Sequence, residues 1–215
     1  MKFIAALLVL AVAPVFAAAT GQLNDAERTF LVDQLELTRK AFVESLTGVT
    51  PAQWRFKAAP DRWSVAECAE HLVLAENYIF QGSQGLLKTP AVARPEKSNE
   101  QVDKTIVSMV TDRSHKLQAP EPLVPKGSLE SPADAIRAFT EKRDRNIAYA
   151  KSTNDDLRVH VGKTPAGEMD AYQLLLLMAA HSARHTAQIR EVEASPNYPK
   201  VSALLRLPRI RIAFD

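Results

Sequence analysis

The sequence predicts an all-α protein, organised as a four-helix bundle in which a long crossover joins the second and third helices. Apolar residues recur at intervals of three and four in four long segments, which is the period of helices packed against neighbours. Alternation of apolar and polar residues, the pattern of a half-buried strand, is nearly absent. The chain has 215 residues, 46% of them hydrophobic and 24% charged, which suits one globular domain or at most two.

The segment before the first helix predicts export. Residues 1–19 carry a lysine, an apolar run that ends at Phe16 and then three alanines, which is typical of a secretory signal peptide. Pro14 and the small-residue end argue against an uncleaved anchor, because a spanning helix needs roughly 20 apolar residues. We therefore expect a secreted or periplasmic mature protein of residues 20–215 without an integral membrane span.

The first two helices are marked by their start and stop signals. One is expected from about Asn24 to Leu46, ending before Gly48, and the stretch from Pro51 to Trp63 is interpreted as a connector. The second helix opens at Ser64, with a glutamate three residues later, the spacing of a capping box. The inward faces of the two helices are Leu31, Leu35, Thr38 and Phe42, then Cys68, His71, Ala75 and Tyr78.

A change of composition separates the second helix from the third. From Gln81 to Glu130 proline and glycine become frequent around one shorter helical piece near Glu100 to Leu117. A connection of this length can cross the whole bundle.

The third helix begins at Ser131 and Pro132, the favoured residues for a cap and a first turn. The fourth follows a turn-rich stretch from Gly162 to Gly167. The inward residues of the third helix are Ile136, Phe139, Arg143, Ile147 and Ala150, and those of the fourth are Leu174, Met178, His181, His185, Gln188 and Val192.

The charge balance predicts no nucleic-acid partner. The formal net charge of +2 comes from 27 basic and 25 acidic residues spread along the chain, too weak a field to attract DNA or anionic lipid. The local exception is a C-terminal tail in which arginines from Arg206 to Arg211 alternate with leucine and isoleucine. We interpret this tail as a strand-like or amphipathic docking segment.

Cys68 is the only cysteine, so no internal disulfide can form. A lone thiol in an exported chain is either buried and inert or reactive. We favour the buried state, because free cysteine is among the most buried residue types.

Three histidines form the candidate site. His181 and His185 are four residues apart on the inward stripe of one helix, so both rings can offer a nitrogen to one ion. His71 on a facing helix would supply a third nitrogen and leave a coordination position for water or substrate. The alternative is that the three rings only form hydrogen bonds in the core. His115 and His160 have polar surroundings and are expected in solvent.

Two segments, RWSVAECAEHLVLAE and DAYQLLLLMAAHSARHTAQI, resemble the DinB/YfiT-like superfamily. The resemblance covers about Asp25 to Val192 and is carried by Trp63, Ser64, His71, His181, Arg184, His185 and Gln188. It implies a DinB-like four-helix bundle domain over residues 20–215 and a divalent metal bound by His71, His181 and His185.

The resemblance also implies a choice of functions. Some relatives are thiol-dependent S-transferases or isomerases that use cytosolic thiols, a setting from which an exported chain departs. We expect a metal-dependent hydrolase or transferase acting on an unknown small molecule, and the alternative is a non-catalytic metal- or ligand-binding module of the cell envelope. Zinc or nickel is expected first, and iron, copper or manganese are alternatives. Pairing into a homodimer is also compatible with such a bundle.

Two further residues are candidates for catalysis. Gln188 could orient the His185 ring or bind a metal-bound water, or it could make a contact between helices. Glu67 lies one turn before His71 and could act as a base, although the helix cap already employs it.

Three other charged residues near the site are not expected to act on a substrate. Arg184 is expected to form an ion pair with an acidic residue rather than bind a substrate carboxylate. Glu70 and Glu76 are expected to be solvated.

Overall fold

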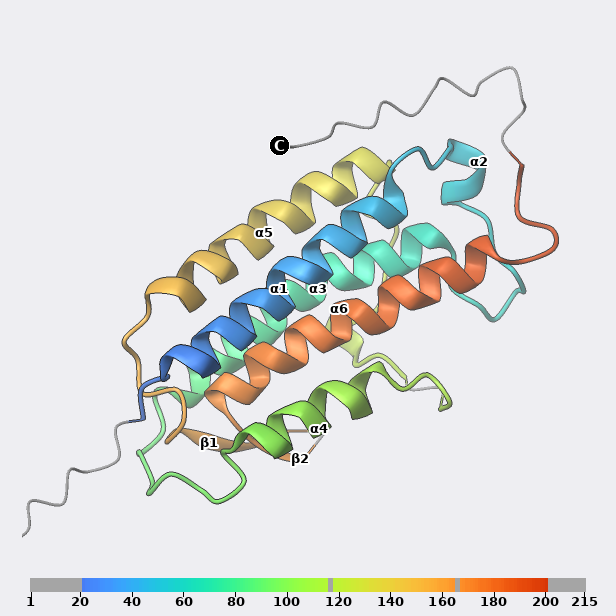
Figure 1. The fold of residues 1–215 in the computed structure, drawn as a ribbon. Helices are drawn as coiled ribbons and strands as arrows, with labels where there is room; N and C mark the ends of the chain where they lie inside the picture. The colour runs from blue at the N-terminus through green and yellow to red at the C-terminus, as the bar shows by residue number, and fades with distance from the viewer. Residues whose placement is uncertain (1–20, 116–117, 165–166, 201–215) are drawn as a thin grey trace, which may run out of the picture.

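The computed structural model describes residues 21–115, 118–164 and 167–200, and four long helices dominate it (Figure 1). These helices are α1 (Asp25–Leu46), α3 (Val65–Leu86), α5 (Pro132–Ser152) and α6 (Ala171–Glu193). Helices α1 and α3 each pack against both α5 and α6, so each long helix touches two others. The prediction of a mostly helical protein is confirmed.

Side-chain caps start all four long helices, and the caps Ser64 and Ser131 are the ones that the sequence predicted. Helices α1, α3 and α6 each begin with a capping box, in which two side chains satisfy backbone N–H groups reciprocally. The pairs are Asn24 with Glu27, Ser64 with Glu67, and Asp170 with Gln173. Helix α5 follows the cap Ser131, whose side chain accepts from the Asp134 N–H, and has Pro132 in its first turn.

A small hairpin corrects the expectation of a purely helical fold. Strands β1 (Val161–Thr164) and β2 (Gly167–Asp170) pair antiparallel and overlap both ends of the stretch from Gly162 to Gly167 that was interpreted as turn-rich. Gly167 has φ 115°, a left-handed conformation that favours glycine. Four residues per strand are too few for alternation to stand out in the sequence, so pattern alone missed the pairing.

The connections also differ from the expected ones. The expected connector after α1 contains a short helix, α2 (Pro51–Trp54), which has its own capping box. Helix α3 runs past Gln81, where the connection was expected to start, to Leu86.

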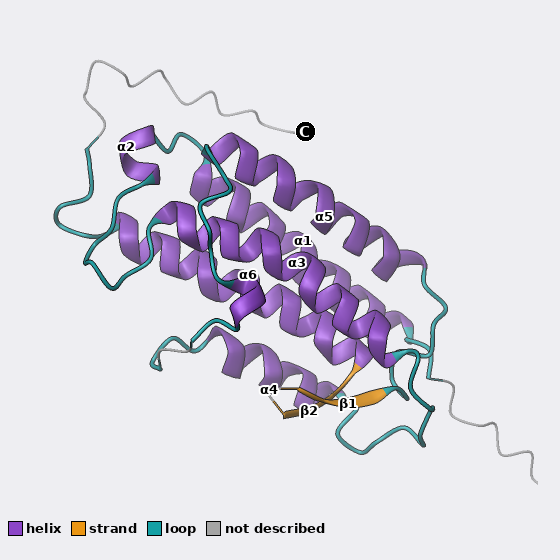
Figure 2. Cartoon of the chain, turned by 180° about the vertical axis from the view of Figure 1, so that it is seen from behind, coloured by secondary structure: helices purple, strands orange, loops and turns teal. Residues whose placement is uncertain are grey.

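Helix α4 (Glu100–Thr111) and the 3-10 turn η1 (Glu121–Leu123) lie in the connection from α3 to α5. Helix α4 ends before the expected Leu117 and packs on the outside of α6 (Figure 1). Figure 2 shows the segment with η1 continuing from α4 toward the start of α5, and η1 contacts α3.

The core consists of two apolar clusters with a buried polar layer between them. This layer includes buried polar residues from all four long helices, among them Thr38 of α1, Glu76 of α3, Arg143 of α5 and Ser182 of α6. The Arg143 guanidinium donates to the Glu76 carboxylate, to both hydroxyls and to the Leu35 carbonyl. The expectation that Glu76 is solvated was wrong: its side chain is 1% exposed, and it pairs with Arg143 in the interior of the protein.

Two expectations fall on parts of the chain that are not described. Residues 1–19, expected to form a signal peptide, and the tail from Arg206 to Arg211 lie outside the described residues. Within residues 21–115, 118–164 and 167–200, no helix has the length and apolarity that crossing a bilayer requires.

Candidate metal centre

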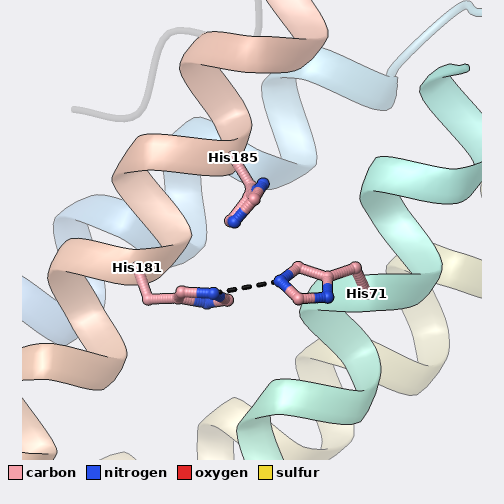
Figure 3. Close-up of side chains that lie close together, drawn as sticks. All are labelled: His71, His181 and His185. Atoms are coloured by element: carbon pink, nitrogen blue, oxygen red, sulfur yellow. Dashed lines mark hydrogen bonds between the residues drawn. The ribbon is translucent and has the colours of Figure 1, made fainter. Parts of the chain in front are cut away.

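The three predicted histidines meet at one point between α3 and α6. His71 projects from α3, and His181 and His185 project from successive turns of α6 (Figure 3). One nitrogen from each ring lies within 4.8 Å of the others, and the ring centroids are 4.4 to 4.8 Å apart. The Nε2 atoms of His71 and His181 are 3.0 Å apart.

This spacing fits a shared ion. Two ring nitrogens that bind one ion at about 2.0 to 2.1 Å lie about 3 Å apart, close to the separation of the two Nε2 atoms. Three imidazoles suit zinc, nickel, copper or iron. In the described part of the chain, the group of side chains that could hold a metal ion consists of these three histidines and does not include Cys68.

The hydrogen bond of His71 fixes its tautomer. Its Nδ1 lies 2.7 Å from the backbone carbonyl oxygen of Leu123 in η1. A carbonyl oxygen only accepts, so Nδ1 carries the hydrogen and Nε2 keeps its lone pair. A second partner that orients a ring in this way is the usual companion of a metal-binding histidine.

His185 and His181 differ in their second partners. The Nδ1 of His185 lies 2.8 Å from the amide oxygen of Gln188, one turn further along α6. The buried Nδ1 of His181 has no hydrogen-bond partner among the described residues. A buried polar atom without a partner costs about 1 to 3 kcal/mol, so the Nδ1 of His181 is the unsatisfied ring atom of the group.

The surroundings keep all three rings neutral. Burial lowers the pKa of His71, although the hydrogen bond to Leu123 opposes this effect. Burial, together with the charges of the other two histidines, lowers the pKa of His181 well below its ordinary value. Burial and the charge of His71 lower the pKa of His185 to about 3. Neutral rings keep the lone pairs that a metal needs.

The Trp63 ring packs against one side of the histidine group. The Trp63 ring centroid lies 4.9 Å from that of His71 and 5.9 Å from that of His185. Trp63 directly precedes Ser64, the cap of α3. The tryptophan–serine motif therefore places an apolar surface against the rings of His71 and His185.

Glu67 is engaged at the start of α3. Its carboxylate accepts from the Ser64 N–H and hydroxyl and forms a 2.7 Å ion pair with Lys57. Burial opposes ionisation, but the hydrogen bonds from Lys57 and Ser64 outweigh it and lower the pKa of Glu67. The capping box is therefore present, and a role as a base stays a prediction.

Cys68 belongs to the core. Its side chain is fully buried, and burial raises the pKa of the thiol far above its ordinary value. The thiol form is therefore strongly favoured over the thiolate that would react or bind metal.

Arg184 binds backbone rather than the acidic side chain that was expected. Its guanidinium donates to the carbonyl oxygens of Val110, Asp112 and His115. Carbonyls at the end of a helix lack partners within the helix, so Arg184 satisfies them and ties the end of α4 to α6. The His115 side chain is exposed, as expected. His160, expected in solvent, is half-buried, and its Nδ1 lies 2.9 Å from the Thr89 carbonyl.

Sequence reasoning missed two further charged residues near the site. Glu70, expected in solvent, is 4% exposed, and its carboxylate accepts from the N–H groups of Lys126, Gly127 and Ser128 and from the Ser128 hydroxyl. Arg113 donates to both carboxylate oxygens of Glu191 and to Gln188. Their partners lie 56 to 78 residues away, so spacing within a helix gave no signal.

Comparison with known proteins identifies a family for this chain. The family model of the DinB superfamily matches residues 34–189, a span that includes all three histidines. Comparison with curated proteins and with solved structures gave no match. Because the matched span is well over half of the 215 residues, the chain belongs to the DinB superfamily.

Proposed function

We propose that His71, His181 and His185 bind one divalent metal ion through their Nε2 atoms. The observation that carries this proposal is the convergence of three neutral rings from two helices, with two Nε2 atoms 3.0 Å apart. Hydrogen bonds from the Nδ1 atoms of His71 and His185 support it, since they leave both Nε2 lone pairs free.

The proposed activity is that of a metal-dependent hydrolase or transferase acting on a small molecule. An ion held by three nitrogens would supply a Lewis acid with a position open to water or substrate. Trp63 would shield one side of the reacting group from water, and Gln188 would hold the His185 ring in place.

A non-catalytic metal- or ligand-binding module is the second candidate. One observation favours it: the carboxylate of Glu67, the candidate base, is already bound to Ser64 and Lys57. Chromogenic carboxyl and phosphate esters, tested with metal-loaded wild type and His181→Ala protein, separate the two candidates. Turnover that disappears in the variant supports the enzyme, and equal rates in both proteins contradict it.

We also propose that the four long helices form a bundle domain with the α3 to α5 connection as its crossover. The pairwise packing of α1 and α3 with α5 and α6 supports this assignment. Export after cleavage near residue 19 belongs to the same proposal and rests on the sequence alone. The mass of the protein recovered from an expression host tests it, because cleavage removes the N-terminal segment.

Metal content tests the site directly. Wild-type protein, purified without chelators and then given zinc or nickel, is expected to hold about one equivalent of metal, measured by mass spectrometry of the elements. His71→Ala and His181→Ala are expected to lose most of it, because each removes a ligand. His115→Ala is the matched control, since that ring is exposed and outside the group. A wild type that binds neither added metal would overturn the proposal.

A further inference from the structure

We infer that the connection between α3 and α5 fixes the tautomers of two of the three histidines proposed to bind the metal. The Leu123 carbonyl fixes the tautomer of His71, and the Arg113 guanidinium fixes that of His185. These groups hold the hydrogens of His71 and His185 on Nδ1, so that both Nε2 lone pairs face the common centre. The role in metal binding rests on the proposed function, whereas the positions of the hydrogens can be measured without any metal.

The first contact is made by η1. Leu123 is 5% exposed, and its carbonyl oxygen lies 2.7 Å from the Nδ1 of His71. The neighbouring residue on α3, Glu70, holds the next part of the connection by accepting three backbone N–H groups and one hydroxyl between Lys126 and Ser128. Hydrogen bonds to a charged group are strong, so Glu70 fixes the place from which Leu123 reaches His71.

The second contact runs through Gln188. The amide oxygen of Gln188 lies 2.8 Å from the Nδ1 of His185 and 3.4 Å from an Nη1 of Arg113. A guanidinium has five donors and no acceptor, so the amide atom between the two groups has to be the oxygen. His185 then has to donate from Nδ1. Arg113 thus sets the tautomer of His185 without touching its ring.

Two contacts keep Arg113 in place. Its Nε and Nη2 donate to the two carboxylate oxygens of Glu191 on α6, at 2.6 and 2.7 Å. Arg184 binds the carbonyls of Asp112 and His115, which flank Arg113 in the sequence. Both the side chain and the backbone of Arg113 are therefore tied to α6, the helix that carries His185.

The tautomer of His71 determines which ring nitrogen of His181 carries the hydrogen. If His71 has a lone pair on Nε2, the 3.0 Å contact with His181 in protein stripped of metal requires His181 to donate from its own Nε2. Binding an ion at that atom moves the hydrogen to Nδ1, which has no partner among the described residues. His71 and His185 thus already have the tautomer that metal binding requires, and His181 has to change its tautomer.

The test is a measurement of tautomers in the full chain. Long-range proton–nitrogen NMR of histidine-labelled, chelator-treated protein distinguishes an N–H from a lone-pair nitrogen in each ring. The wild type is expected to carry hydrogens on Nδ1 of His71, Nδ1 of His185 and Nε2 of His181. Added zinc is expected to shift only the His181 hydrogen between ring nitrogens.

Two variants of Arg113 test its role. Arg113→Met removes the donors, and Arg113→Gln offers an oxygen that allows the Gln188 amide to turn over. Both are expected to give His185 a mixture of tautomers and to weaken zinc binding by about 10- to 100-fold, the usual effect of losing a partner of a ligand. Arg137→Met is the matched control, because that arginine is exposed on α5 and pairs with Asp134.

A second substitution that restores the tautomer of His185 distinguishes a positioning role of Arg113 from a role in stability alone. A carboxylate only accepts, so Gln188→Glu is expected to restore the Nδ1 hydrogen of His185 in the Arg113→Met background. Glu70→Gln is expected to give His71 a mixture of tautomers and to weaken zinc binding by about 10-fold. Glu44→Gln on the exposed face of α1 is the control and is expected to change neither the tautomers nor the zinc affinity.

The outcomes are distinct. A single Nδ1 tautomer of His185 in folded Arg113→Met and Arg113→Gln proteins, with unchanged zinc affinity, would overturn the inference. A mixture in those variants without zinc binding in any protein would uphold the tautomer assignment and contradict the proposed function instead.

Discussion

The ligand histidines combine burial with neutrality. A buried ring that remained protonated would repel both its neighbours and an incoming cation. Here burial is the main cause that lowers the pKa values of His71, His181 and His185, and each charged ring would disfavour the next. The neutral rings suit the proposed metal ion, and they lower the stability of the fold in acid.

The acid sensitivity of the fold follows from these shifts. The pKa of His185 falls from 6.5 to about 3 on folding, so the unfolded chain takes up its proton at a higher pH than the folded protein. Stability is thus complete above pH 6.5 and is lost as the pH falls below it. At pH 5, His185 alone is expected to lower the free energy of unfolding by about 2 kcal/mol relative to pH 7.

Urea unfolding of chelator-treated protein at pH 7, 6 and 5 measures this effect. His71 and His181 are expected to add to it in the same direction, because their pKa values are also lowered. His185→Gln keeps a polar group at the position but cannot titrate. The variant should therefore lose less stability between pH 7 and pH 5 than the wild type, by about the contribution expected from His185. Equal losses in the two proteins would contradict the assignment.

At the scale of elements, the sequence predicted what depends on local chemistry. The caps Ser64 and Ser131 stand where the pattern placed them, because capping is decided by residues three apart. The inward stripe of α6 correctly brought His181 and His185 to one face toward His71.

The features that were missed depend on contacts distant in the chain. The hairpin of β1 and β2 is too short to leave a pattern, and burial of Glu70 requires the connection to fold back onto α3. The carbonyl of Leu123 could not be found either, because every residue has a backbone oxygen. Sequence thus predicted which three histidines come together, but not the groups that form hydrogen bonds with their rings.

The buried polar layer links all four long helices. Arg143 of α5 is 0% exposed and Glu76 of α3 is 1% exposed, and the pair is surrounded by hydroxyls from α1 and α6. Removing one member leaves the other charge buried without its partner. Arg143→Met is therefore expected to lower the free energy of unfolding by about 3 to 5 kcal/mol.

Urea unfolding at pH 7 measures this change, and an exposed pair provides the control. Arg39 and Asp144 form an ion pair 2.6 Å long between α1 and α5, with side chains 35% and 52% exposed. Arg39→Met is expected to cost at most about 1 kcal/mol, since exposed ion pairs contribute little. Comparable losses from the two substitutions would show that burial does not govern the Arg143 pair.

At the scale of the whole molecule, buried charges anchor the α3 to α5 connection along its length. Arg158, fully buried before β1, donates to Asp103 near the start of α4 and to the α6 cap Asp170. Arg184 holds the end of α4, and Glu70 holds the residues after η1. The connection is thus part of the packed structure, which supports the inference that it orients the His71 and His185 rings.

Metal binding is expected to stabilise this whole assembly. The proposed ligands His71 on α3 and His181 on α6 are 110 residues apart in the chain, so the unfolded protein does not hold them together. At a free zinc concentration 100 times the dissociation constant, the gain is about 2.7 kcal/mol, which raises Tm by roughly 5 to 10 °C for a domain of this size.

Thermal unfolding followed by circular dichroism, with and without zinc, measures this gain. His71→Ala should unfold at the same temperature in both conditions, because it leaves ligands on α6 only and no longer joins the two helices through the ion. His115→Ala should keep the full shift, since its ring is exposed and outside the group. An equal rise of Tm in wild type and His71→Ala would place the stabilising zinc elsewhere on the molecule, because the ion would then act without the α3 ligand.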